Sequence, residues 1–216
     1  MITLFPAFAM VAAVLWLSGI LLRRAGRSAS GNALYASGIF ALAAYVAALW
    51  VVLGRPPLRT LGETRLLYAL LLPAVALGIA LRWKIGWPMI YGAAVAAVFL
   101  AINAARPDNF DKTLMPALQS AWFVPHVVVY ILAYAFLTAS ALGAVRFLLG
   151  RDDTLPACDR AVWIGLAFLT MGLLFGAFWA KEAWGHYWMW DPKETWAFLT
   201  WAIYLAYIHV RLDHAQ

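Results

Sequence analysis

The chain has 216 residues, of which 65% are hydrophobic and 12% are charged. A water-soluble domain carries about twice that share of charge, so the composition excludes an ordinary soluble domain and indicates a membrane protein. The formal net charge of +6 comes from basic residues in short segments between apolar runs, where such residues set topology and meet anionic headgroups. No stretch alternates basic and aromatic residues over a polar surface, so nucleic-acid binding is also excluded.

Seven apolar runs predict an all-α fold, a polytopic bundle of about seven transmembrane helices, because one span takes about 20 apolar residues. The runs are roughly 3–22, 33–53, 66–82, 85–103, 122–149, 160–180 and 195–210. No internal repeat or low-complexity linker separates them, so we expect residues 1–216 to form a single integral-membrane domain. The first run has no basic leader and no cleavage site, which predicts a retained span rather than a signal peptide.

Basic residues set the predicted orientation of the chain. One face receives nine of them, namely Arg23, Arg24, Arg27, Arg82, Lys84, Arg146, Arg151, Arg160 and Arg211, and the opposite face receives seven. The positive-inside rule therefore predicts that the N-terminus is outside and the C-terminus inside. In a bacterium, the loop between the last two runs would then face the periplasm from the inner (cytoplasmic) membrane.

Two other outer segments are expected to be ordered. Residues 54–65, GRPPLRTLGETR, are polar and contain a single acid, Glu63. Residues 105–126 are expected to include a short amphipathic helix on the membrane surface. The only cysteine, Cys158, allows neither an internal disulfide nor a CxxC motif, so any thiol chemistry must use the thiols of another protein.

Tryptophans are concentrated in the outer segment 179–196, WAKEAWGHYWMWDPKETW, which holds five of the 12 in the chain. An interfacial belt scatters indoles over all helix ends, whereas here they gather in one loop. The loop members are Trp184, His186, Tyr187, Trp188, Trp190 and Trp196. Such a cluster suits a large planar ligand such as haem, whose propionates would bind Lys181, Lys193 or an arginine. A membrane-surface anchor is the other interpretation, and the residues alone leave both open.

The end of this segment has the pattern of a helix start. Asp191 suits the N-cap, Pro192 the first helical position and Glu194 the third. The pattern therefore predicts that the seventh helix begins here.

Haem iron commonly takes histidine as an axial ligand, and three histidines are candidates. His126 lies at the outer start of the fifth run, and His186 lies in the tryptophan loop. His209 lies near the inner end of the seventh run, roughly 25 Å below the loop at a helical rise of 1.5 Å per residue. His126 and His209 are too far apart to share one haem. They are either two stations for a haem that crosses the bilayer or interfacial residues satisfied by water and headgroups.

The motif WGHYWMWDPKETW resembles the WWD signature of haem-handling membrane proteins. The ending DPKETWAFLTWAIYLAYIH resembles in particular the CcsA/ResC type, which serves system II cytochrome c maturation. The segments GRPPLRTLGETR and WFVPHVVVYILAYA are similar to an outer loop of that type and to its span with the first outer histidine. The likeness covers about residues 54–210.

The resemblance implies a function and a set of partners. Haem b would be received from the cytoplasmic side, held at the WWD loop and attached to the CxxCH cysteines of an apocytochrome c. A ResB/CcsB-like membrane protein would be the partner, with a thioredoxin-like thiol reductant. By position, His126 matches the first outer axial ligand of the haem iron, and His209 matches the transmembrane histidine of the haem entry site. The haem-cradling loop corresponds to Trp184, Trp188, Trp190 and Asp191.

One departure from the family pattern concerns the second outer ligand. The family has one more span, which ends in a second axial histidine, whereas this chain ends at Gln216. Either the sequence is a fragment, or a partner supplies the ligand, or His186 replaces it. No residue resembles a nucleophile or an acid–base pair, so any catalysis would act through orientation. The alternative functions are a haem exporter or chaperone of the CcmC type without a synthase role, and a structural membrane subunit.

Overall fold

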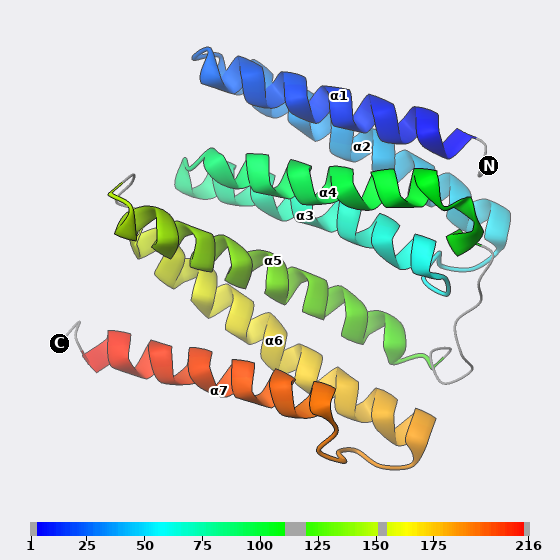
Figure 1. Cartoon of the computed structure of the whole chain (residues 1–216), viewed down its shortest axis with the longest axis vertical. Helices are drawn as coiled ribbons and strands as arrows, with labels where there is room; N and C mark the ends of the chain where they lie inside the picture. The colour runs from blue at the N-terminus through cyan, green and yellow to red at the C-terminus, as the bar shows by residue number, and fades with distance from the viewer. Residues whose placement is uncertain (1–3, 111–119, 151–154, 214–216) are drawn as a thin grey trace. The chain divides into compact units, whose positions relative to one another are not determined.

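The computed structural model describes residues 4–110, 120–150 and 155–213. Within these ranges the chain forms seven α-helices and one short 3-10 helix, and no β-strand. The elements are α1 (Phe5–Arg24), α2 (Ser28–Leu53), α3 (Leu61–Trp83), α4 (Trp87–Ala105), η2 (Pro107–Phe110), α5 (Phe123–Leu148), α6 (Leu155–Trp184) and α7 (Pro192–Asp213). Figure 1 shows them in chain order. The prediction of an all-α bundle is therefore confirmed.

Six of these helices, α1 to α6, are long and apolar enough to cross a membrane. The seventh, α7, has 22 residues and so has sufficient length. Its tryptophans, tyrosines and His209 make it less apolar than the others. The helices fit an integral membrane protein.

The predicted surface helix within 105–126 falls largely outside the described residues, which omit 111–119. In the described part, α4 runs to Ala105, η2 follows it, and α5 begins at Phe123. Arg151, one of the basic residues used to predict orientation, also lies outside the described residues.

The described helices fall into two compact units, residues 1–114 and 115–216. The first unit contains α1 to α4 with η2, and the second contains α5 to α7. That residues 1–216 form one domain stays a prediction.

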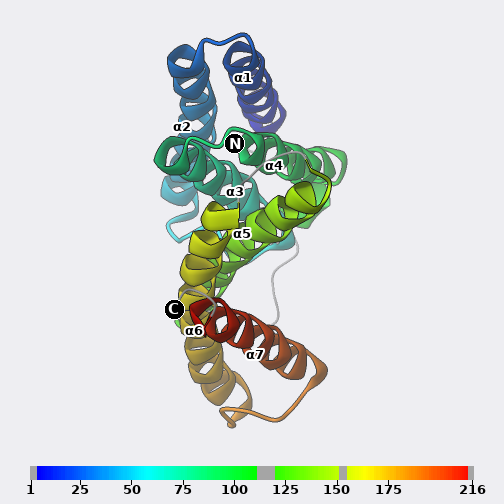
Figure 2. The ribbon, with the colours of Figure 1, turned by 90° about the vertical axis from the view of Figure 1, so that its left-hand side faces the viewer.

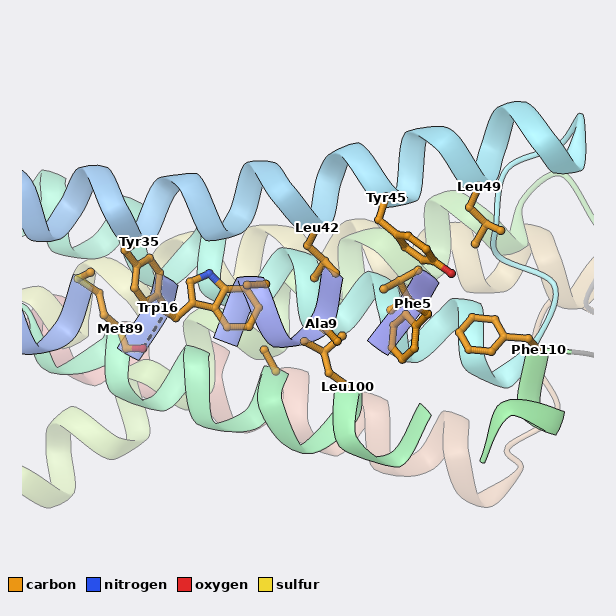
Figure 3. Close-up of a cluster of buried hydrophobic side chains, with 14 of the residues drawn as sticks. Phe5, Ala9, Trp16, Tyr35, Leu42, Tyr45, Leu49, Met89, Leu100 and Phe110 are labelled. Atoms are coloured by element: carbon orange, nitrogen blue, oxygen red, sulfur yellow. Dashed lines mark hydrogen bonds between the residues drawn. The ribbon is translucent and has the colours of Figure 1, made fainter. Parts of the chain in front are cut away.

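The first unit is built from two helical hairpins, α1 with α2 and α3 with α4 (Figure 1). The α1–α2 hairpin packs closely because both helices have a glycine where they meet. A Cβ added to Gly19 would lie 2.6 Å from the carbonyl oxygen of Gly31. Figure 3 shows the core of this unit, where the Tyr35 hydroxyl donates a hydrogen bond of 2.9 Å to the carbonyl of Met89. Further core side chains are Phe5, Trp16, Leu42, Tyr45, Leu49, Leu100 and Phe110.

Helix α3 begins earlier than the apolar run predicts, at Leu61 rather than near residue 66. The reason is a capping box, in which the Thr60 hydroxyl accepts from the Glu63 amide and the Glu63 carboxylate accepts from the Thr60 amide. Glu63 is 3% exposed, and its two oxygens also accept from the Arg55 guanidinium at 3.0 Å each. The Arg59 amide adds a bond of 2.6 Å. The single acid of the 54–65 segment therefore fixes that segment onto α3.

We expect the substitution Glu63→Ala to lower the free energy of unfolding by about 2–4 kcal/mol, because it removes one member of a largely buried ion pair and half of a capping box. Thermal unfolding in detergent, followed by circular dichroism, measures the effect. Arg59→Ala is the control, since the Arg59 side chain is exposed and only its backbone amide binds Glu63. Equal stability of the two variants would contradict this account of the segment.

The second unit contains the hairpin of α5 and α6, with α7 packed against α6 (Figure 2). Its core is made by Ala133, Leu137, Val162, Leu166, Leu169 and Ile208. Gly165 on α6 leaves room for the Leu137 side chain of α5, because a Cβ added at Gly165 would lie 2.7 Å from that side chain. Figure 2 also shows the loop 185–191 joining the separated ends of α6 and α7. All of the candidate site residues belong to this unit.

Candidate functional site

His126 lies in the first turns of α5, and its ring faces α6. Its Nδ1 is 2.9 Å from the carbonyl oxygen of Gly172. Gly176, one turn further along α6, leaves the space for the ring, because a Cβ there would lie 2.8 Å from Cε1 of His126. A carbonyl oxygen can only accept, so in the neutral ring this contact places the proton on Nδ1. The lone pair is then on Nε2, which no described residue engages.

Aromatic rings surround the His126 imidazole. Trp179 of α6 stacks on it with ring centroids 5.6 Å apart and planes 23° from parallel. Tyr130, one turn along α5, meets it edge-on at 4.7 Å. The Tyr130 ring in turn occupies the space over Gly172, where a Cβ would lie 2.5 Å away. A histidine with one nitrogen bound to a carbonyl and the other free is the arrangement that metal-binding histidines adopt.

The tryptophan loop starts where α6 ends at Trp184. Gly185 has a φ of +85° and turns the chain out of the helix. The Lys181 ammonium donates to the carbonyl of Gly185 at 2.9 Å and lies 5.4 Å from the centroid of the Tyr187 ring. Lys181 therefore holds the start of the loop. His186 is exposed at its beginning.

The remaining loop tryptophans continue into a row of aromatic rings on α7. Trp188 meets Trp190 edge-on at 5.7 Å, and Trp190 meets Phe198 edge-on at 5.8 Å. Phe198 stacks on Trp201, with ring centroids 6.1 Å apart. The indole nitrogen of Trp201 donates to the Thr170 hydroxyl of α6 at 2.9 Å. Trp184 and Trp190 are exposed, whereas Trp188 is half-buried. The loop thus exposes indole rings to the surroundings, and one of them, Trp190, packs against Phe198 of α7.

The predicted helix start at Asp191, Pro192 and Glu194 is confirmed. Helix α7 begins at Pro192, and the Glu194 amide donates to Oδ1 of Asp191 at 2.8 Å. Oε2 of Glu194 accepts from the Asp191 amide at 3.3 Å, which completes a capping box. The Asp191 carboxylate is thus engaged with the backbone.

The second unit brings His126 and the tryptophan loop to the same end. Ser120, just before α5, donates to Oε2 of Glu182 near the end of α6 at 2.6 Å. The Trp122 ring lies 4.8 Å from that of Phe178. The turn that leads into His126 is therefore joined to the last turns of the helix that leads into the loop.

His209 lies at the opposite end of the unit, near the C-terminus of α7, and is exposed. Its Nδ1 is 2.8 Å from the Leu205 carbonyl, so its Nε2 is also directed away from its own helix. Asp159 near the start of α6 accepts from the Tyr207 hydroxyl at 2.6 Å and from Nε of Arg211 at 3.1 Å, and these two residues flank His209 in the chain. These bonds fix the end of α7 on α6, and with it the direction that His209 faces.

We expect Asp159→Ala to loosen this end of α7 by about 1–2 kcal/mol, because it removes a partly exposed ion pair and the bond from Tyr207. Hydrogen–deuterium exchange of α7 measures the effect, which should be largest over residues 205–213. Tyr207→Phe loses one of the bonds to Asp159 and should show a smaller increase. Unchanged exchange in Asp159→Ala would show that the hydrophobic contacts alone hold the helix end.

Sequence reasoning did not connect His126 with the four residues that surround it, namely Tyr130, Gly172, Gly176 and Trp179. A signal for two of them is present in the chain. The stretch GLLFG, residues 172–176, places glycines four apart, a spacing that in membrane helices marks close approach of a neighbour. The spacing does not say which helix approaches.

Fold and site together define an integral membrane protein with an aromatic-lined histidine and a tryptophan-rich loop at one end of a helical unit. The chain belongs to the cytochrome c assembly protein family, whose model matches residues 1–216. It is similar to the cytochrome c biogenesis protein CcsA of Chlamydomonas reinhardtii, with 36% identity over 183 residues, covering 76% of this chain and 52% of that protein. The same-named protein of Prochlorococcus marinus subsp. pastoris is 31% identical over 208 residues, covering 76% of this chain and 65% of the relative.

A third CcsA, from Synechococcus sp. (strain JA-3-3Ab), is 30% identical over 244 residues, covering 79% of this chain and 71% of that protein. The chain thus spans between about half and about seven tenths of the length of these relatives. Family membership indicates a role in cytochrome c biogenesis.

Proposed function

We propose that this chain is the haem-handling subunit of a cytochrome c synthase. It moves haem b across the membrane and presents it at the tryptophan loop for covalent attachment to the CxxCH segment of an apocytochrome c. The observation that carries this proposal is the environment of His126, whose Nδ1 is bound to a carbonyl and whose Nε2 is free, at the same end of the unit as the loop. Haem is the substrate here.

The donor set supports iron within a porphyrin rather than a bare ion. Among the described residues, no three histidine, cysteine, aspartate or glutamate side chains gather closely enough to hold a metal ion. Single histidines beside aromatic rings suit iron that arrives with its four equatorial ligands already in place. The exposed indoles of Trp184 and Trp190, with half-buried Trp188 in contact with Trp190, suit the apolar ring. Asp191 acts there as the N-cap that fixes the loop against α7.

The two outer lysines are suited to different tasks. Lys181 is engaged with Gly185 and Tyr187, so it stabilises the loop. Lys193 is exposed in the first turn of α7 and makes no hydrogen bond or ion pair with the described residues. Of the two, Lys193 is therefore the better partner for a haem propionate. His186, exposed at the start of the loop, is a further residue that would meet the haem or supply a second axial ligand.

His209 is the proposed inner station. Its exposed ring with a free Nε2 would take haem from the cytoplasmic side before His126 receives it at the other end. An imidazole on a membrane helix is costly unless it has a partner, which favours a functional position. A ResB/CcsB-like membrane protein is the proposed partner at this step.

The chain's own residues would act by orientation and by exclusion of water. In the reaction each cysteine thiol adds across one haem vinyl group, so that sulfur bonds to one carbon and the proton to the other, without loss of electrons. The cysteines must be reduced beforehand, the task of a thioredoxin-like reductant. The carboxylates of Asp191 and Glu194 are engaged in the capping box, so we assign no acid–base role to them. In the proposed setting, the bacterial inner membrane, the loop faces the periplasm.

The test uses the chain co-expressed with a ResB-like partner, purified in detergent and examined by visible spectroscopy. A Soret band, and covalent haem on a co-expressed CxxCH reporter cytochrome, are the expected results. A serine-substituted SxxSH reporter is the control that must stay haem-free. Bound haem without any holocytochrome would indicate a haem exporter of the CcmC type. Complete absence of bound haem would refute haem handling and leave a structural subunit anchored by its loop.

A further inference from the structure

Trp190 has an unusual backbone conformation for a large side chain. Its φ is +57°, and among the described non-glycine residues only Lys84 shares a positive value. The left-handed region brings the Cβ atom close to neighbouring backbone, so a residue other than glycine is held there only when its surroundings require it. Residues in such conformations are found at ligand-binding sites more often than elsewhere.

Side chains in the first turn of α7 form hydrogen bonds with Trp190 and with the residues on either side of it. Oε2 of Glu194 accepts from the Met189 amide at 2.7 Å and from the Asp191 amide at 3.3 Å. These two amides belong to the residues immediately before and after Trp190. The Thr195 hydroxyl donates to the carbonyl oxygen of Trp190 itself at 3.2 Å.

Two of these bonds are more than a helix start requires. A capping box needs only the reciprocal bonds between Asp191 and Glu194. The Met189 amide lies outside that box, and the Thr195 hydroxyl bonds to Trp190 rather than to a free amide at the helix end. Their shared effect is to fix the backbone of Trp190.

The fixed backbone determines how the indole is presented. The Trp190 ring meets Trp188 and Phe198 edge-on, at interplanar angles of 87° and 83°. Its exposed fraction is 64%. The ring therefore contacts two aromatic neighbours at steep angles while most of its surface stays open, and open indole surface is what stacking on a planar molecule requires.

We propose that Glu194 and Thr195 are positioning residues that hold Trp190 in its left-handed conformation, ready to stack on a porphyrin. This proposal rests on the proposed function for its ligand, but the hold on Trp190 is a property of the free protein. Pre-set side chains bind more tightly because the ordering cost is met before the ligand arrives. The effect is on the affinity for haem and on the orientation of the bound ring.

The test compares Thr195→Val with Thr200→Val. Both substitutions are nearly isosteric and remove a hydroxyl that donates to a tryptophan carbonyl, since Thr200 donates to Trp196 within α7 at 2.8 Å. Only the first touches Trp190. Near-ultraviolet circular dichroism of the haem-free chain reports the tryptophan cluster, and titration with ferric haem in detergent, in the presence of the partner, reports affinity.

We expect Thr195→Val to weaken the near-ultraviolet tryptophan bands and to lower haem affinity by about 3- to 10-fold, the loss expected for one hydrogen bond. Thr200→Val should change neither signal. Glu194→Gln keeps one acceptor oxygen and should fall between wild type and Glu194→Ala in both measurements.

Identical spectra for Thr195→Val and Thr200→Val in the haem-free state would contradict the proposal that Thr195 fixes the conformation of Trp190. A spectral change in Thr195→Val without any loss of haem affinity would show that fixing Trp190 does not contribute to haem binding. Failure of the wild-type chain to bind haem would instead count against the proposed function and, with it, the porphyrin as ligand. In that case the dichroism of the haem-free variants still decides whether Glu194 and Thr195 fix Trp190.

Discussion

His126→Ala is expected to lose more than 99% of the haem affinity at the loop end of the second unit while the helices remain folded. Loss of an outer-shell partner alone costs about 10- to 100-fold in metal affinity, and removal of the iron ligand itself should exceed that. The fold should survive, because the His126 side chain makes a single hydrogen bond, to the Gly172 carbonyl of α6, and the loss of one such bond costs about 1 kcal/mol. Haem titration followed at the Soret band measures the first effect, and thermal unfolding the second.

The matched control is His186→Ala, which removes the same side chain from an exposed position in the loop. It should lower haem affinity much less than His126→Ala. Added imidazole should restore part of the lost absorbance in His126→Ala by entering the space beside Trp179. Stoichiometric haem in His126→Ala, or an equally large loss in His186→Ala, would show that the axial ligand has been assigned to the wrong histidine.

Gly176→Ala is expected to have the second largest effect, a loss of about 10- to 100-fold in haem affinity through displacement of the His126 ring. The added Cβ would lie 2.8 Å from Cε1 and 2.9 Å from Nδ1 of His126, too close for the ring to stay in place. A displaced ring would lose its stacking contact with Trp179 and the hydrogen bond from Nδ1 to the Gly172 carbonyl. The strain should also destabilise the fold by about 1–3 kcal/mol.

Gly78→Ala is the control for this substitution. Gly78 is an exposed helical glycine of α3, and a Cβ added there meets nothing within 4 Å, so the change should be neutral or stabilise the helix by up to about 1 kcal/mol. The ferric spectrum of Gly176→Ala should shift as well, since a displaced ring ligates the iron weakly. An unchanged spectrum and affinity would mean that α6 does not position His126.

The number and order of the helices could be predicted because span length and helix starts are local properties. The capping residues Asp191, Pro192 and Glu194 fixed the start of α7 to the residue. The apolar run predicts the start of α3 too late, because the polar residues before it, including Thr60 and Glu63, form a capping box that extends the helix. Polar residues can belong to a helix when they satisfy its first amides.

The surroundings of His126 could not be predicted, for a physical reason. Helices in a membrane are apolar all round, so their sequence does not show which face meets a neighbour. The histidine and the tryptophan loop are recognisable by residue type alone. The pairing of α5 with α6, which brings Gly172 and Gly176 to His126, depends on the shapes of both helices together.

The partner of His126 Nδ1 also bears on the electronic character of any iron bound at Nε2. That partner is the backbone carbonyl of Gly172, which is a dipole without a full negative charge. A carboxylate in the same place would give the imidazole partial imidazolate character and favour the ferric state. An imidazole bound to a carbonyl donates less electron density, so iron held by His126 would have a higher reduction potential and would remain ferrous more readily.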